Sequence, residues 1–303
     1  MKVNTIIIGA GRSGTTSLYE YLKQHPDVYF SITKEVHYFS IAELYARGES
    51  YFHSLFPDVK DQKIIATADT YLLIDKQAPE RIKNYNPAMK IIILLRDPVD
   101  RAYSNYNYSI NYGHEKKQVS FLGSMPLEYD RLNNLNIVDQ NNLCHFYGSL
   151  YDQHVSYWMQ FFPAENFIIL KTDDLQKSPQ QTVNQLFNFL KIKEITIDTS
   201  QKFNKAAKAK SKYIQQLLLN RDHPLRKIMR IFLKPFRNIL IRSGIIDKIS
   251  GMNKTEAVID PLNEAERKAA SAYFEKDLLM LDANYHIRFP KFNYIYPHPE
   301  TKS

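Results

Sequence analysis

The segment that most constrains the fold is residues 4–22, which read NTIIIGAGRSGTTSLYEYL. An apolar, β-branched run that ends in glycine is typical of a buried parallel strand. Apolar residues at helical spacing follow, at Leu18, Tyr21 and Leu22. Strand, glycine turn and helix in this order favour an anion site, because the backbone amides of the turn and of the helix N-terminus converge on one point. We therefore expect a phosphate-type group to bind at this turn.

The glycine turn fits two phosphate-binding patterns, each incompletely. Its three glycines spell the G-x-G-x-x-G of dinucleotide sites, which also need an acidic residue about 20 positions further on, and Glu35 is near that place. Residues 9–16 also spell G-x-x-x-x-G-K-[ST], with Thr15 in place of the lysine that reaches the β- and γ-phosphates of a nucleoside triphosphate. Arg12 puts a positive charge inside the turn instead, which suits a single charged group at the 5′ end of a sugar.

A second candidate anion site lies in LLRDPVDRAYSNY, residues 94–106. Arg96 at a strand end and Ser104 on the following helix can converge on one anion, as a charge-assisted fork and a hydroxyl. The alternative is an ordinary helix start with an Asp97–Arg101 ion pair. Two neighbouring anion sites indicate a nucleotide with phosphates at two places on its ribose, and they argue against the dinucleotide interpretation.

The remaining strand candidates are residues 27–32, 63–73, 89–98 and 165–175. A helix over residues 178–192 follows the last of them, with Ser178 as its N-cap and Pro179 at its first position. Strands that alternate with helices predict an α/β fold with a central parallel sheet flanked by helices. We expect a single domain over residues 1–303, with its core at about 4–200.

Three segments depart from this alternation. Residues 105–145 are rich in Asn and Tyr and predict irregular structure and short helices beside the sheet. Residues 213–249 predict a basic helical segment. Residues 261–285 predict an amphipathic C-terminal helix that packs on the sheet.

Composition narrows the compartment and the partners. The sequence shows no run of about 18 apolar residues and no signal-peptide pattern. A single cysteine, Cys144, excludes an internal disulfide and favours a reducing, cytoplasmic compartment. The net charge of +8 is concentrated in residues 201–250, where 13 Lys and Arg residues face two Asp residues. This segment is either a solvated helix face or a positive wall for an anionic ligand or membrane. Residues 225–242 are candidates for peripheral membrane contact, unless their apolar side packs on the domain.

Three motifs together resemble a known family. GAGRSGTTSLYEYL at residues 9–22, TKEVHYFS at 33–40 and LLRDPVDRAYSNY at 94–106 are similar to motifs of the sulfotransferases that use 3′-phosphoadenosine 5′-phosphosulfate (PAPS). The likeness is greatest to the branch of the heparan sulfate sulfotransferases and their bacterial relatives. The resemblance covers residues 4 to about 200. It implies a P-loop NTPase-like sulfotransferase fold and transfer of a sulfuryl group to a hydroxyl or amine, best fitted by a carbohydrate or glycolipid acceptor.

The resemblance also implies roles for individual residues. Glu35 would be the general base, with Lys34 and His37 positioning it, the sulfuryl group or the acceptor. Arg12 stands where the family usually has a lysine and would stabilise the leaving phosphate oxygen. Other nucleotide contacts would come from the glycine turn, from the second motif and from a basic loop, at Ser13, Gly14, Thr15, Thr16, Ser17, Arg96, Ser104, Lys210 and Ser211.

The acceptor is less constrained by the sequence. Asp69, Tyr71 and Tyr151 are candidate acceptor contacts, each with the alternative of a structural role. We expect no metal requirement, since none of the nine histidines shows metal-ligand spacing with a carboxylate. We also expect no nucleic-acid partner. Two other functions remain open: a P-loop-type small-molecule kinase that uses Mg²⁺ and ATP, and a non-enzymatic, membrane-associated nucleotide-binding module.

Overall fold

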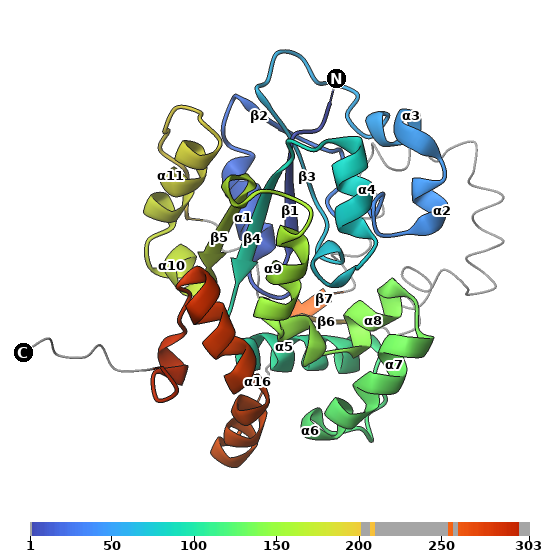
Figure 1. The fold of residues 1–303 in the computed structure, drawn as a ribbon, viewed down its shortest axis with the longest axis vertical. Coiled ribbons are helices and arrows are strands. Elements are labelled where there is room, and N and C mark those ends of the chain that lie inside the picture. Colours follow the sequence, from blue (N-terminus) through green and yellow to red (C-terminus); the bar gives the residue numbers. More distant parts are fainter. Residues whose placement is uncertain (1, 201–206, 210–253, 257–259, 297–303) are drawn as a thin grey trace, which may run out of the picture.

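The computed structural model describes residues 2–200, 207–209, 254–256 and 260–296. Five parallel strands form one sheet in the order β2-β3-β1-β4-β5 (Figure 1). The strands are β1 Thr5–Gly9, β2 Val28–Phe30, β3 Ile64–Ala68, β4 Lys90–Leu95 and β5 Phe167–Lys171. Each lies within a segment that the sequence predicts to be a strand. The predicted α/β class with a central parallel sheet is therefore confirmed.

Apolar side chains on both faces of the sheet explain why its strands read as continuous apolar runs. In β4, Ile91, Ile93 and Leu95 belong to the core on one face, and Ile92 and Leu94 belong to the core on the other. All five are completely buried. Successive side chains of a strand point to opposite faces, so a strand that is covered by helices on both sides needs apolar residues at every position.

Helices cover both faces of the sheet (Figure 1). The core that contains Ile92 is closed by α1 Thr15–Leu22, α10 Thr172–Lys177 and α11 Pro179–Phe189. The core that contains Ile91 is closed by α3 Gly48–His53, α4 Ala78–Tyr85, α5 Pro98–Tyr112, α9 Tyr151–Met159 and α16 Glu264–Tyr285. Ser178 and Pro179 begin α11 as predicted, although the Ser178 side chain makes no capping hydrogen bond.

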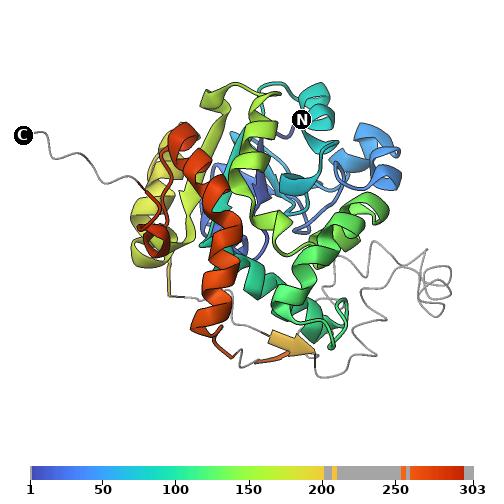
Figure 2. The ribbon, with the colours of Figure 1, turned by 60° about the horizontal axis from the view of Figure 1, so that its bottom comes forward.

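Short elements connect these layers. The remaining α-helices among the described residues are α2 Ala42–Tyr45, α6 Phe121–Ser124, α7 Glu128–Asn134 and α8 Ile137–Leu143. The 3₁₀ turns in the part of the chain that the structure describes are η1 Leu72–Ile74, η2 Met125–Leu127, η3 Tyr147–Ser149, η4 Ala164–Asn166 and η6 Pro290–Phe292. Two further strands, β6 Ala207–Ala209 and β7 Lys254–Glu256, pair antiparallel, and β6 packs against α5 (Figure 2).

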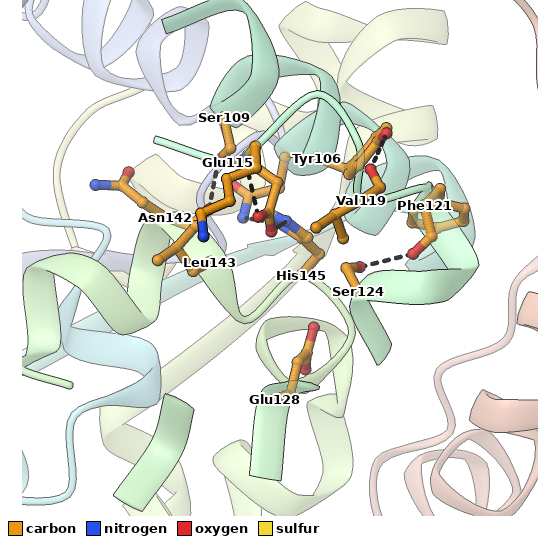
Figure 3. A network of polar contacts seen from close by, with 12 residues as sticks. Tyr106, Ser109, Glu115, Val119, Phe121, Ser124, Glu128, Asn142, Leu143 and His145 are labelled. Atoms are coloured by element: carbon orange, nitrogen blue, oxygen red, sulfur yellow. Dashed lines mark hydrogen bonds and ion pairs between the residues drawn. The ribbon is translucent and has the colours of Figure 1, made fainter. Parts of the chain in front are cut away.

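Residues 105–145 contain the short helices that the sequence predicts, and buried polar contacts link them. Glu115 is 5% exposed, and its carboxylate accepts hydrogen bonds from Arg131 at 2.7 and 3.0 Å. The same carboxylate lies 3.6 Å from His145 Nε2 (Figure 3). Burial alone would raise the pKa of Glu115, but His145 and Arg131 lower it to about 2. The ionised carboxylate thus links the end of α5 to α7 and to the segment after α8.

The C-terminal helix differs from its prediction in its neighbours. It begins at Glu264 rather than residue 261, and it packs mainly on α9 and α5 instead of on the strands (Figure 2). Asp100 at the start of α5 contributes to this packing by pairing with Arg267 and, at 2.6 Å, with Lys291.

Several predictions fall outside the described residues. These are the nucleotide contacts of Lys210 and Ser211, the basic helical segment 213–249 and the membrane contact through 225–242. Among the described helices, none has the length and apolar character that crossing a membrane requires.

Candidate active site

The segments that follow the five strands meet at the carboxyl edge of the sheet, which faces α5 to α8 (Figure 1). β1 is the central strand, with β3 on one side and β4 on the other. After β1 the chain forms β2 and β3 on one side of that strand, and it then crosses to form β4 and β5 on the other side. The order of the strands reverses at β1, and such a topological switch point is where open α/β sheets bind ligands. Gly11 and Thr70, which follow β1 and β3, lie so close that a Cβ on Gly11 would be 3.6 Å from the Thr70 side chain.

Residues 10–14, the anion loop, join β1 to α1. Gly14 adopts φ +93° at the N-cap of α1, a conformation that favours glycine. No side chain caps α1 and no acidic residue lies in its first turn. The N-terminal amides of a helix need partners from outside the helix. The local structure therefore presents backbone donors and the positive end of the helix dipole, as the sequence predicts for an anion site.

Arg12, Arg96 and Ser104 lie together beside the anion loop. Arg12 Nε is 3.4 Å from Ser104 Oγ, and its guanidinium stacks over the Tyr108 ring at 4.8 Å. Arg96 Nη1 donates to the carbonyl of Arg12 at 3.2 Å. The two anion sites predicted from separate motifs are thus adjacent in space, as one nucleotide with two phosphates would need.

Arg101 does not form the ion pair with Asp97 that the alternative interpretation of the motif predicts. The Asp97 carboxylate accepts from the Asp100 amide at 2.9 Å and caps α5. The Arg101 side chain, 3% exposed, instead donates from Nε to the Gly11 carbonyl at 3.0 Å and from Nη1 to the His145 carbonyl at 2.9 Å. The motif therefore reaches the anion loop through Arg101 as well as through Arg96.

Glu35 is held at the carboxyl edge by groups that follow β3. Its backbone adopts φ +60°, which is uncommon for a residue with a side chain, and its amide donates to the Ala68 carbonyl at 2.8 Å. Glu35 Oε2 accepts from the amide and the hydroxyl of Thr70 at 2.7 and 3.1 Å, and Oε1 pairs with Lys34. Because Thr70 also lies against Gly11, this carboxylate is next to the anion loop.

His37 lies beside Glu35 and is fixed by Asp69. Its Nδ1 is 3.0 Å from Asp69 Oδ1, and its ring stacks on Tyr71 with centroids 4.2 Å apart. Asp69 also accepts from Ser40 Oγ at 2.8 Å and from the Tyr71 amide at 3.1 Å. Burial alone would raise the pKa of Asp69, but the charge of His37 and these hydrogen bonds lower it below its ordinary value.

The three predicted acceptor contacts are placed differently from one another. Tyr71 is partly exposed beside His37. Asp69 is 1% exposed, and Tyr151 is fully buried with its hydroxyl donating to the Arg96 carbonyl at 2.8 Å. Contact of Asp69 or Tyr151 with an acceptor stays a prediction, and it would require the surrounding structure to open.

Glu35, His37 and Asp69 also bring one potential metal-ligand atom each to within 4.8 Å of one another. Lys34 pairs with Glu35 at the same place, and its ammonium group would repel a cation. The expectation that the reaction needs no metal stays a prediction.

Two contributors to the site are missed by sequence reasoning. Thr172, the residue after β5, is 4% exposed, with its Oγ1 2.6 Å from the Ser13 carbonyl and 3.0 Å from the Leu95 carbonyl. Thr70 fixes Glu35. Thr172 is the first residue after β5 and Thr70 the second after β3, and a place at a strand end is the one signal by which the sequence could have marked them.

A family model described as "sulfotransferase domain" matches residues 2–230. The chain belongs to the sulfotransferase domain family. This confirms the family that the three motifs resemble and the predicted fold. It gives no support to the kinase or to the binding-only module as alternatives.

Relatives within the family indicate which branch the chain is similar to. It is 30% identical to human heparan sulfate glucosamine 3-O-sulfotransferase 6 over 66% of this chain and 55% of that protein. It is also 30% identical to mouse heparan sulfate glucosamine 3-O-sulfotransferase 5, over 62% and 53%. The chain thus spans about half the length of these curated relatives. The crystal structure of a sulfotransferase from Alicyclobacillus acidocaldarius shares the fold, with a TM-score of 0.68, 22% identity, and coverage of 96% of this chain and 99% of that one.

Proposed function

We propose that this protein is a PAPS-dependent sulfotransferase that transfers a sulfuryl group to a hydroxyl or amine of a carbohydrate or glycolipid. The observation that carries the proposal is the adjacency of three groups that come from different strand ends. These are the uncapped N-terminus of α1, the Arg12–Arg96–Ser104 cluster, and the Glu35 carboxylate held by Thr70. Family membership supports the same chemistry.

The residues fit the proposed co-substrate. Ser13 is completely buried in the anion loop, and among the described residues its hydroxyl has no hydrogen-bond partner. An unpaired buried hydroxyl is costly, and an oxygen of a bound anion would remove that cost. Arg96 and Ser104 offer a charged fork and a hydroxyl for a 3′-phosphate. When bound, PAPS supplies the sulfuryl group and leaves as adenosine 3′,5′-bisphosphate.

The catalytic roles follow from the contacts. Glu35 takes the proton of the acceptor hydroxyl or amine as the acceptor attacks sulfur, while Thr70 and Lys34 keep the carboxylate in place. Arg12 stabilises the negative charge that forms on the 5′-phosphate oxygen. Arginine does not release a proton near neutral pH, so this stabilisation is electrostatic rather than acid catalysis.

The names of the relatives support a carbohydrate acceptor, because both are called heparan sulfate glucosamine 3-O-sulfotransferases. A cytoplasmic location, a single domain over residues 1–303 and a membrane contact through residues 225–242 remain parts of the proposal. The membrane contact would bring the site to a glycolipid.

The test is release of adenosine 3′,5′-bisphosphate during incubation with PAPS and a panel of oligosaccharide, glycolipid and small-molecule acceptors. We expect Glu35→Gln to abolish turnover and to leave the dissociation constant for adenosine 3′,5′-bisphosphate unchanged. The exposed Glu80 on α4 provides the matched control, since Glu80→Gln should keep full activity. No release with any acceptor, or full activity of Glu35→Gln, contradicts the proposal. Mg²⁺-dependent phosphoryl transfer from ATP would favour the kinase.

A further inference from the structure

Three successive carbonyls of the anion loop are each bound by a side chain from a different element. The Gly11 carbonyl accepts from Arg101 of α5 at 3.0 Å, and the Arg12 carbonyl accepts from Arg96 after β4 at 3.2 Å. The Ser13 carbonyl accepts from Thr172 Oγ1, at the start of α10, at 2.6 Å.

Holding a carbonyl also fixes an amide. In a trans peptide the C=O and the following N–H point in opposite directions within one plane, and these three peptide bonds are not cis. Arg101 therefore orients the Arg12 amide, Arg96 the Ser13 amide, and Thr172 the Gly14 amide. The Ser13 amide is used inside the turn, on the Ala10 carbonyl at 3.3 Å. The amides of Arg12 and Gly14 remain as donors for a ligand. Arg101 and Thr172 orient these two amides, each of which points away from the side chain that orients it.

We propose that Arg101 and Thr172 are positioning residues for the 5′-anion site, which bind loop carbonyls so that the loop amides face the ligand. This inference rests on the proposed function for the identity of the ligand. Neither residue has to touch the nucleotide. Both are buried, at 3% and 4% exposure, and both donate to backbone carbonyls. The oxyanion-type site is thus built before the ligand arrives, which lowers the cost of ordering the loop on binding.

The space around these side chains agrees with a fixed role. A Cβ on Gly148 would lie 2.5 Å from Arg101 Nη1, so the guanidinium fills the room that a larger residue would need. The Thr172 hydroxyl lies between the carbonyls of Ser13 and Leu95 and connects the loop to the end of β4. Thr172 is the better residue to test, because valine keeps its shape and removes only the hydroxyl.

The experiment compares two ligands by calorimetry, adenosine 3′,5′-bisphosphate and adenosine 3′-monophosphate. We expect Thr172→Val to weaken the bisphosphate by roughly tenfold, the effect of about one hydrogen bond. Adenosine 3′-monophosphate has no 5′-phosphate to enter the anion loop, so it should bind Thr172→Val with the same affinity as it binds the wild type. Thr172→Ser should restore the affinity for the bisphosphate. Thr182→Val is the matched control, since Thr182 is 2% exposed and donates to the Ser178 carbonyl at 3.0 Å in α11.

The possible results distinguish failure of this inference from failure of the proposed function. Equal weakening of both ligands, or a bisphosphate affinity in Thr172→Val that matches Thr182→Val, overturns the inference. A wild-type protein that binds both ligands with this difference but transfers no sulfuryl group contradicts the proposed function alone. A wild type that binds the bisphosphate no better than adenosine overturns both.

Discussion

The adjacency of two anion sites makes a quantitative prediction for Arg96. Replacing it by alanine removes the proposed hydrogen bond to a charged 3′-phosphate, an interaction worth about 1.5–3 kcal/mol. It also removes the bond from Nη1 to the Arg12 carbonyl at 3.2 Å, a bond to an uncharged acceptor worth about 0.5–1.5 kcal/mol. The first loss affects ligands with a 3′-phosphate, while the second affects every ligand that uses the loop.

Comparing the wild type with Arg96→Ala for two ligands, one with and one without a 3′-phosphate, separates these two losses of binding free energy. We expect Arg96→Ala to weaken the binding of adenosine 3′,5′-bisphosphate by roughly 30- to 1,600-fold and that of adenosine 5′-monophosphate by roughly 2- to 10-fold, at about 1.4 kcal/mol for each factor of ten. Titration calorimetry at fixed salt measures both constants. Arg47→Ala is the control, because Arg47 is exposed and stacks on Tyr51 away from the loop. Equal losses for the two ligands would refute the assignment of the 3′-phosphate to Arg96.

Two further predictions concern the base and the buried charges. Asp69→Asn should lower kcat by roughly tenfold or more, since mispositioning by a small distance is costly in rate, and should leave the nucleotide dissociation constant unchanged; an unchanged kcat would remove Asp69 from the site. Glu115 has a pKa lowered from 4.5 to about 2, so its contribution to stability is present above pH 4.5 and is lost as the pH falls through 2. Urea unfolding should therefore show Glu115→Gln less stable than the wild type at pH 7, by at most about 3 kcal/mol, with the difference shrinking towards pH 2; a constant difference would contradict the pairing.

The sheet and the anion loop could be predicted because local sequence determines them. Each strand is a short apolar run, and a strand buried on both faces leaves no other pattern possible. The glycines of the loop are required by backbone geometry, as Gly14 at φ +93° shows. The motif over residues 94–106 predicts that Arg96 and Ser104 lie close together, because one stands at a strand end and the other on the helix that follows. The structure places both beside Arg12.

The supports of the site could not be predicted, because they depend on contacts between residues far apart in the sequence. Thr172 is 159 positions from Ser13, and the two meet only because β5 and β1 end at the same edge. Glu115, Arg131 and His145 each look like surface residues in the sequence until the fold brings them together. Only the fold shows that Asp69 is buried and pairs with His37, while its contact with an acceptor stays a prediction.

Arg12 connects the two halves of the proposed nucleotide site through a single guanidinium. It belongs to the anion loop, yet its Nε is 3.4 Å from Ser104 and its plane lies over Tyr108 of α5. A lysine in its place would have no planar face for Tyr108 and no fixed fork for Ser104. In the proposed function, arginine at this position therefore supplies a rigid charge between the two proposed phosphate sites and transfers no proton. Because Arg101 and Arg96 hold the carbonyls on either side of the Arg12 Cα, the direction of this charge is set by the same network that orients the loop amides.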